Sequence, residues 1–336
     1  ERPVKQTLKS SERGVVVISC LRARAVTVVC TDKMQSRRAF QDITNNVSGG
    51  VSEAPTHVNK KPLKSDRKAD EIDARDAKNP QACTEYVQDM YTHFRVKEDG
   101  TLRVHPTYMA NQPHINEKMR AILIDWLVEV HLKFKLVPET LYLTVNVIDR
   151  YLRTQAVERS NLQLVGVSAL LLASKYEEIY PPELKDLVYI TDKAYTAEQI
   201  LVMEEQMVKA LKYNMTVSSI HLFMMRYLKA GHADRRMVWL ASYVCERTLQ
   251  EYNMLKHKPS VVASCAVYVA RKNLNRNAWS PTLTHYTGYG QHDLQDCLQD
   301  IAAVLLANRG SLHAVKKKYQ SEKYGQVANE RLVILD

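Results

Sequence analysis

Apolar residues recur three and four positions apart through most of the chain after about residue 83. This spacing places them along one side of an α-helix and is typical of helices that pack in a bundle. The pattern predicts one set of helices along 115–130, 141–152, 162–176 and 200–211, and a second set along 219–230, 234–252, 260–273 and 294–305. We therefore expect an all-α protein.

Local signals mark several ends of these helices. Pro138 suits the first turn of a helix, and Thr196 with Gln199 forms a capping-box pattern. Pro181 and Pro182 should end the third helix, because proline cannot continue one. The segments that begin at Ser168 and Ser264, 96 residues apart, share small residues around a bulky middle, which favours two similar bundles.

The first part of the chain has no helical apolar spacing and carries most of the excess positive charge. The whole sequence has 47 Lys+Arg against 37 Asp+Glu, a formal net charge of +10, and residues 1–75 contribute +6 of it. Such a composition favours a flexible segment. The predicted organisation is a flexible tail (1–79), an N-terminal helix with a linker (80–112), two helical bundles (113–214 and 215–320) and a C-terminal tail (321–336).

No catalytic signature is visible, so we expect a protein that acts through its surfaces rather than an enzyme. The sequence has no phosphate-binding glycine loop, no nucleophile elbow and no zinc-protease motif. Six cysteines without a paired spacing indicate neither a disulfide framework nor a metal site. We expect no cofactor and no membrane partner, since no apolar run approaches about 18 residues. The first residue is Glu1 rather than Met, which suggests a fragment or a processed product.

The segment 119–131 is apolar on more than one face, so it is either central to a bundle or exposes an apolar patch to a partner. Together with 139–144, 162–166, 171–183, 188–192 and 199–204, it closely resembles the cyclin box of the mitotic cyclins. The stretch 130–135 resembles the B type more than the A type. The resemblance implies two consecutive five-helix cyclin-box bundles after the flexible tail.

The same resemblance implies a function and a set of residues. The function is that of a regulatory subunit, in the nucleus and the cytoplasm, that binds and activates a mitotic cyclin-dependent kinase and controls mitotic entry. The kinase-binding residues it implies are Lys175, Tyr176 and Glu204, with Glu177 and Glu178 expected to meet arginines of the kinase. It also implies a buried ion pair between Arg120 and Asp149. A simple surface ion pair between Lys175 and Glu204 is the competing interpretation.

A second implied surface would bind substrates that carry an Arg/Lys-x-Leu motif. Its residues would be Met119, Ile122, Leu123, Trp126, Glu129, Leu162 and Gln163. Four of them lie on one helical stripe, where the ring of Trp126 would receive the substrate leucine and Glu129 its basic residue. The competing interpretation is that the whole stripe belongs to the core.

The segment 37–45 in the tail resembles the destruction box of mitotic cyclins, with Arg37, Phe40, Ile43 and Asn45 at the pattern positions. The family more often has Leu where Phe40 stands. This motif implies removal by ubiquitin-dependent proteolysis through a ubiquitin ligase receptor. Lysines downstream are possible acceptors, and the basic run 59–68 is either a nuclear import signal or a solvated linker.

A protein similar to transcription factor IIB is the alternative, because that family shares the two-bundle fold and a basic charge. Such a protein would bind DNA by neutralising its phosphates. The sequence lacks the paired cysteines of a zinc ribbon, so we expect no specific nucleic acid partner.

Overall fold

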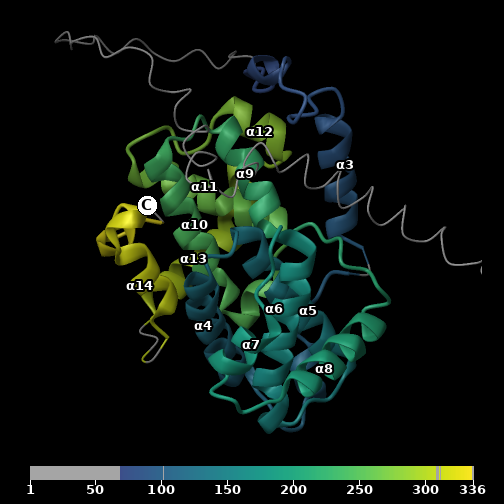
Figure 1. The fold of residues 1–336 in the computed structure, drawn as a ribbon. Coiled ribbons are helices and arrows are strands. Elements are labelled where there is room, and N and C mark those ends of the chain that lie inside the picture. The colour runs from purple at the N-terminus through teal and green to yellow at the C-terminus, as the bar shows by residue number, and fades with distance from the viewer. Residues whose placement is uncertain (1–68, 101, 308–309, 311, 335–336) are drawn as a thin grey trace, which may run out of the picture. The chain divides into compact units, whose positions relative to one another are not determined.

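The computed structural model describes residues 69–334 except 101, 308, 309 and 311, and these residues form helices, turns and irregular segments without a strand (Figure 1). The all-α prediction is therefore confirmed. The chain divides into two units, of which the smaller contains residues 71–92 and the larger contains 69–70 and everything described from 93 onward. All contacts discussed below lie within the larger unit.

The first bundle consists of five helices. They are α4 (Glu117–Phe134), α5 (Pro138–Thr154), α6 (Leu162–Glu177), α7 (Leu184–Ile190) and α8 (Ala197–Ala210). Helix α6 is the central one, because it packs against α4, α5 and α8 and is buried on every face from Leu164 to Ser174. The side chains of Val165, Val167 and Ala169 have no exposed surface. The core of the bundle therefore surrounds α6.

The second bundle repeats this plan with α9 (Ile220–Ala230), α10 (Arg235–Leu249), α11 (Pro259–Asn273), α12 (Pro281–Thr287) and α13 (Gln295–Leu306). Helix α11 packs against both α9 and α10, as α6 packs against its neighbours, so the two segments that resemble each other in sequence are the two central helices. Two five-helix bundles were expected, and both are present. Helix α12 has no counterpart among the periodic segments, because seven residues are too few to show a helical period.

Further helices precede and follow the bundles. Helix α3 (Val87–Glu98) comes before the first bundle, and α14 (Ala314–Gln320) follows the second. Short 3-10 helices occur at Ala74–Asp76, Tyr108–Asn111, Arg159–Asn161, Tyr252–Lys256, Gln291–Leu294, Glu322–Tyr324 and Val327–Asn329.

The segment after α14 is packed on the second bundle rather than extended as a tail. Val327 is fully buried and Ile334 nearly so. Gly325 has a positive φ of 61° and lies so close to Trp239 that an added Cβ would come within 2.6 Å of the indole ring. The segment lacks a periodic pattern because its buried residues lie on irregular backbone.

Most helices begin where the sequence predicts. Asn116, Ser219 and Asp234 accept a hydrogen bond from the backbone of the first turn that follows them. Ser280 does the same for α12, whose start was not predicted. Thr196 and Gln199 form the expected capping box. In the described part of the chain, no helix combines the length and the apolar character that crossing a membrane requires.

Candidate functional site

A buried ion pair joins the first two helices of the first bundle. Arg120 on α4 contacts Asp149 on α5 through two hydrogen bonds, from Nε at 2.6 Å and from Nη2 at 2.8 Å. Tyr108 donates a third bond to the same carboxylate, at 2.7 Å. Burial alone would lower the pKa of the guanidinium, but the Asp149 carboxylate outweighs it and raises that pKa. The pair expected from the sequence is thus present, and both oxygens of the Asp149 carboxylate accept a bond from Arg120.

The same arginine also reaches the second bundle. Arg120 Nη1 donates to the backbone oxygen of Leu249, at the end of α10, over 3.1 Å. A buried charge needs partners for all of its donors, so this contact orients the guanidinium as well as joining the bundles.

Lys175 and Glu204 lie together on the surface of the first bundle. Lys175 is in the last turn of α6 and Glu204 is on α8, and Lys175 Nζ lies 2.7 Å and 2.8 Å from the two carboxylate oxygens. The lysine side chain is 47% exposed and the glutamate side chain 13%. Tyr176, the next residue, is half-buried, and its hydroxyl lies 2.6 Å from Thr216 Oγ1. Lys175 and Glu204 therefore form a partly exposed site where α6 meets α8, and Tyr176 beside them contacts the segment that follows α8.

Exposed apolar side chains occur in the same part of the bundle, and the sequence analysis did not single them out. Ile179 and Tyr180 follow α6, and Leu201 and Val202 are on α8. Leu201 lies one turn before Glu204 and therefore shares its face of α8. The sequence could have indicated that Leu201 and Val202 are exposed, because they fall outside the apolar spacing 200, 203, 207 and 211 that marks the core side of α8. Leu201 thus places an exposed apolar side chain beside the charge pair, a combination that a protein interface can use as a buried core with a polar rim.

Glu178 has an internal role that the sequence did not suggest. Its Oε1 accepts hydrogen bonds from the backbone N of Val137 and from Thr140 Oγ1, both at 2.7 Å. Val137 precedes α5 and offers no capping side chain, so Glu178 caps α5 from the far end of α6. The predicted contact between Glu178 and kinase arginines stays a prediction, and only the second carboxylate oxygen would be available for it. Glu177 is half-buried at the end of α6.

The predicted docking stripe combines exposed and half-buried side chains with buried ones. Ile122 and Glu129 are exposed, and Met119, Trp126 and Gln163 are half-buried, whereas Leu123 and Leu162 are buried. The core interpretation of the stripe thus applies to the two leucines alone. Gly166 on α6 leaves room for Leu123, because a Cβ at this glycine would come within 2.7 Å of Leu123 Cδ1. The stripe therefore consists of accessible side chains above an apolar base.

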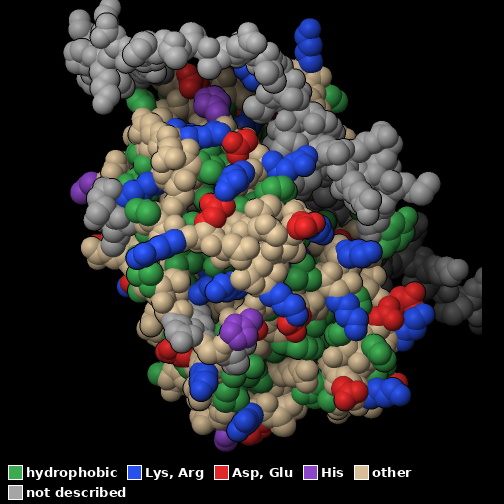
Figure 2. Space-filling model, turned by 90° about the vertical axis from the view of Figure 1, so that its left-hand side faces the viewer, with side chains coloured by type: hydrophobic (Ala, Val, Ile, Leu, Met, Phe, Trp, Pro, Cys, Tyr) green, Lys and Arg blue, Asp and Glu red, His purple; other side chains and the backbone are tan. Residues whose placement is uncertain are grey.

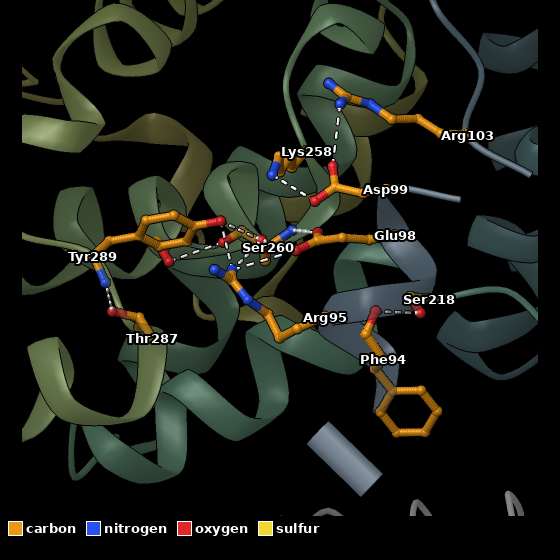
Figure 3. Close-up of polar contacts among 11 residues, drawn as sticks. Phe94, Arg95, Glu98, Asp99, Arg103, Ser218, Lys258, Ser260, Thr287 and Tyr289 are labelled. Carbon is orange, nitrogen blue, oxygen red and sulfur yellow. Dashed lines mark hydrogen bonds and ion pairs between the residues drawn. The ribbon is translucent and has the colours of Figure 1, made fainter. Parts of the chain in front are cut away.

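The end of α3 is bonded to the second bundle by a polar cluster (Figure 3). Glu98 accepts hydrogen bonds from the backbone N of Ser260 at 3.0 Å and from its hydroxyl at 2.7 Å. Arg95 donates to Ser260 Oγ at 2.6 Å and to Tyr289 Oη at 2.5 Å. Burial raises the pKa of the Glu98 carboxyl. Because Lys258 gives α11 no side-chain cap, Glu98 supplies one from α3.

Surface charge in the larger unit shows no basic band on the face drawn in Figure 2. Lys and Arg side chains are interspersed there with Asp and Glu. A nucleic-acid-binding face gathers positive charge along a groove or a helix. This face therefore does not suit the DNA-binding alternative. Among the described residues, no three His, Cys, Asp or Glu side chains are grouped to hold a metal ion.

Comparisons with known proteins cover both bundles. A model of the cyclin N-terminal domain matches residues 89–216, and a model of the cyclin C-terminal domain matches residues 217–331. The crystal structure of a viral cyclin from herpesvirus saimiri has the same fold, with a TM-score of 0.54 at 19% identity, over 68% of this chain and 96% of that chain.

Similar sequences carry the names of B-type cyclins. Cyclin-B2-1 of Oryza sativa subsp. japonica is 42% identical over 304 residues, which are 90% of this chain and 72% of the rice protein. Cyclin-B1-3 of Arabidopsis thaliana is 47% identical over 77% of this chain and 62% of its own length. The G2/mitotic-specific cyclin-B of Hydra viridissima is 44% identical over 79% and 67%. These matches replace the transcription-factor alternative, and the chain belongs to the cyclin family, within its B-type branch.

Proposed function

We propose that this cyclin is a regulatory subunit that binds and activates a cyclin-dependent kinase of the mitotic type. The observation that carries the proposal is the surface pair of Lys175 and Glu204, which lies next to the exposed Leu201 where α6 meets α8. Relatives named as mitotic cyclins support the kinase as the partner. An apolar patch provides the area for binding, and the charge pair provides hydrogen bonds that fix the orientation of the partner.

Activation would follow from binding one conformation of the kinase. A kinase is active when its conserved Lys–Glu ion pair and its activation loop are in place. A protein that binds only this state shifts the population toward it. Moving the equilibrium from about 1:99 to 99:1 takes roughly 5.5 kcal/mol of differential binding. The two charges alone would not supply that energy, so the exposed apolar residues must contribute to it.

The test is to add the purified chain to an inactive cyclin-dependent kinase and to follow histone phosphorylation. We expect activation by the unmodified chain, and at least tenfold weaker kinase binding, about 1.4 kcal/mol, after Lys175→Ala or Glu204→Ala. Lys209→Ala is the matched control, since it removes an exposed ion pair with Glu205 on the same helix, α8. No rise in phosphorylation with the unmodified chain would refute the activating function. An equal loss with Lys209→Ala would show that Lys175 and Glu204 have no specific role.

The docking stripe supports a second part of the proposal, the binding of substrates with an Arg/Lys-x-Leu motif. Ile122 and Trp126 would receive the leucine, and Glu129 is exposed to meet the basic residue. Burying one leucine contributes about 2 kcal/mol, and an exposed ion pair less than about 1. Docking of this strength acts by raising the concentration of the substrate at the kinase.

The tail supports a third part, removal of the chain by ubiquitin-dependent proteolysis after recognition by a ligase receptor. Arg37, Phe40, Ile43 and Asn45 lie outside the described residues, so this part rests on the sequence motif. Control of mitotic entry, and action in both nucleus and cytoplasm, complete the proposed role.

A further inference from the structure

The segment after residue 311 extends from the second bundle onto the first. Helix α14 packs against α10 of the second bundle and against α4 of the first, and Figure 1 shows it beside α4. The residues after it then return to α10, where Gly325 lies against Trp239. Residues 312–334 therefore contact both bundles.

Asp125 on α4 forms the first anchor of this segment. Its Oδ1 accepts hydrogen bonds from the backbone N of Ala314 at 3.0 Å and from Gln250 Nε2 at 2.6 Å. Its Oδ2 accepts from the backbone N of His313 at 3.3 Å. His313 itself provides no side-chain cap for α14. One carboxylate thus joins the first bundle to the start of α14 and to the end of α10.

The second anchor is a buried ion pair between α14 and α10. Lys318 Nζ lies 2.6 Å from Glu246 Oε1, and Tyr319 donates to the same oxygen at 2.7 Å. The two charged side chains are only 3% and 2% exposed. The ring of Tyr319 also lies 5.5 Å from that of Tyr243 and 5.0 Å from that of Tyr324. An ion pair this deeply buried stays in place only while both partners remain, so it fixes α14 on the second bundle.

Packing between the bundles is incomplete elsewhere. A partly open pocket of about 120 Å³ lies between them, lined by α5 residues such as Val145 and Asn146 and by residues of the second bundle such as Leu249 and Val262. Asn146 Oδ1, which is buried, has no hydrogen-bond partner. At this pocket the two bundles are less closely packed than the interior of either one, so contacts elsewhere contribute more to fixing the angle between them.

We propose that residues 312–334 form a clasp that fixes the angle between the two bundles, with Asp125 and Glu246 as its anchor residues. A partner that contacts both bundles then meets a preset geometry. The clasp acts within the chain alone, so the proposal stands or falls independently of the kinase.

The experiment measures the distance between the bundles in the full chain. Nitroxide labels are attached at Gln206→Cys on α8 and Gln299→Cys on α13, both exposed positions, with Cys20, Cys30 and Cys83 replaced by serine. The three remaining cysteines are buried and should stay unlabelled. Electron–electron double resonance should give a narrow distance distribution for the unmodified clasp. Asp125→Ala with Lys318→Met should at least double its width, and Lys317→Met, an exposed lysine of the same helix, should not change it.

Asp125→Asn keeps one acceptor for the backbone of α14, so its distribution should lie between those of the unmodified chain and Asp125→Ala. Hydrogen exchange at the amides of His313 and Ala314 shows whether the clasp has opened. Faster exchange there with an unchanged width would overturn the proposal. If the double variant loses helical content, the half-buried Asp125→Ala carries the test in comparison with Gln250→Ala, which removes only the direct bond between Asp125 and the end of α10. Equal widths for these two variants would overturn the proposal.

Discussion

Trp126 is the residue that best distinguishes a substrate-binding role of the docking stripe from a purely structural one. It is half-buried on α4 one turn after the exposed Ile122, above the buried Leu123. Trp126→Ala should leave kcat for short peptides unchanged and raise KM for Arg/Lys-x-Leu substrates roughly tenfold to thirtyfold, since about 2 kcal/mol of apolar burial is lost. Steady-state kinetics of the activated kinase measure both values.

The control for this prediction is Trp239→Ala, which removes a half-buried tryptophan from α10 instead. It should leave KM for both substrate classes unchanged. An equal rise in KM for substrates without the leucine would mean that Trp126 is structural.

His131 should make the stability of the chain depend on pH. It is 3% exposed, and its Nε2 lies 2.9 Å from the backbone oxygen of Val137. Burial, aided by the positive charge of Lys318, lowers the pKa of His131 to about 4. The unfolded chain has an ordinary histidine pKa of about 6.5, so it binds a proton that the folded chain does not bind between these values. Stability contributed by His131 is therefore lost as the pH falls from about 6.5 to about 4, on the order of 3 kcal/mol.

Urea denaturation at several pH values across this range measures the loss. His131→Gln keeps a donor for Val137 and does not titrate, so its stability should fall less steeply with acid than that of the unmodified chain. The other titrating groups are common to both proteins and cancel in the comparison. Parallel curves would show that His131 does not carry the effect.

Three helices lack a capping side chain of their own and receive a carboxylate from a distant element. Glu178 caps α5, Glu98 caps α11 and Asp125 caps α14. Local caps such as Asn116 can be predicted, because the capping residue directly precedes the helix. A carboxylate 162 residues away, as Glu98 is from Ser260, leaves no local signal. Helices α5 and α11 were predicted from their apolar spacing and α14 was not, and for none of the three could the capping group be predicted.

Replacing Glu98 tests how much such a distant cap contributes. Glu98→Gln leaves an NH₂ group opposite one of the two donors of Ser260, so we expect a loss of about 1–3 kcal/mol in the free energy of unfolding. The pKa of Glu98 is raised in the folded chain, so the folded chain binds more protons than the unfolded chain as the pH falls. This proton uptake stabilises the unmodified chain but not Glu98→Gln, so the difference between them should grow in acid. Chemical denaturation at pH 7 and pH 5 measures it. Asp99→Asn, which loses the exposed ion pair with Lys258, should cost less than about 1 kcal/mol.

The helices that the sequence predicts are long, and those that it misses are short. The long helices α4, α5, α6 and α8 show their period over three or more turns, but α12 and α14 have seven residues each. Burial could also not be predicted at single positions, and Lys318 shows this most clearly. It lies in a run of three lysines, which is typical of a solvated surface. Its partner, Glu246, is 72 residues away. No local pattern indicates that this lysine is buried.

The lifetime of the whole chain should depend on the tail motif. Arg37→Ala with Phe40→Ala should prolong the lifetime in mitotic extract several-fold, because a ligase receptor would lose both a charged and an apolar contact. Arg13→Ala with Val16→Ala removes the same residue spacing elsewhere in the tail and should not change the decay. Immunoblotting over time measures both. Unchanged decay of the first variant would rule out the motif as a degradation signal.

The bonds at the end of α3 determine how the chain would respond to a mechanical load. Arg95 and Glu98 are joined to Ser260 and Tyr289, far along the sequence. A motor that pulls from the N-terminal side would therefore stress α11 before α4, although α4 comes first in the chain. The second bundle, and not the nearer one, would take the initial strain.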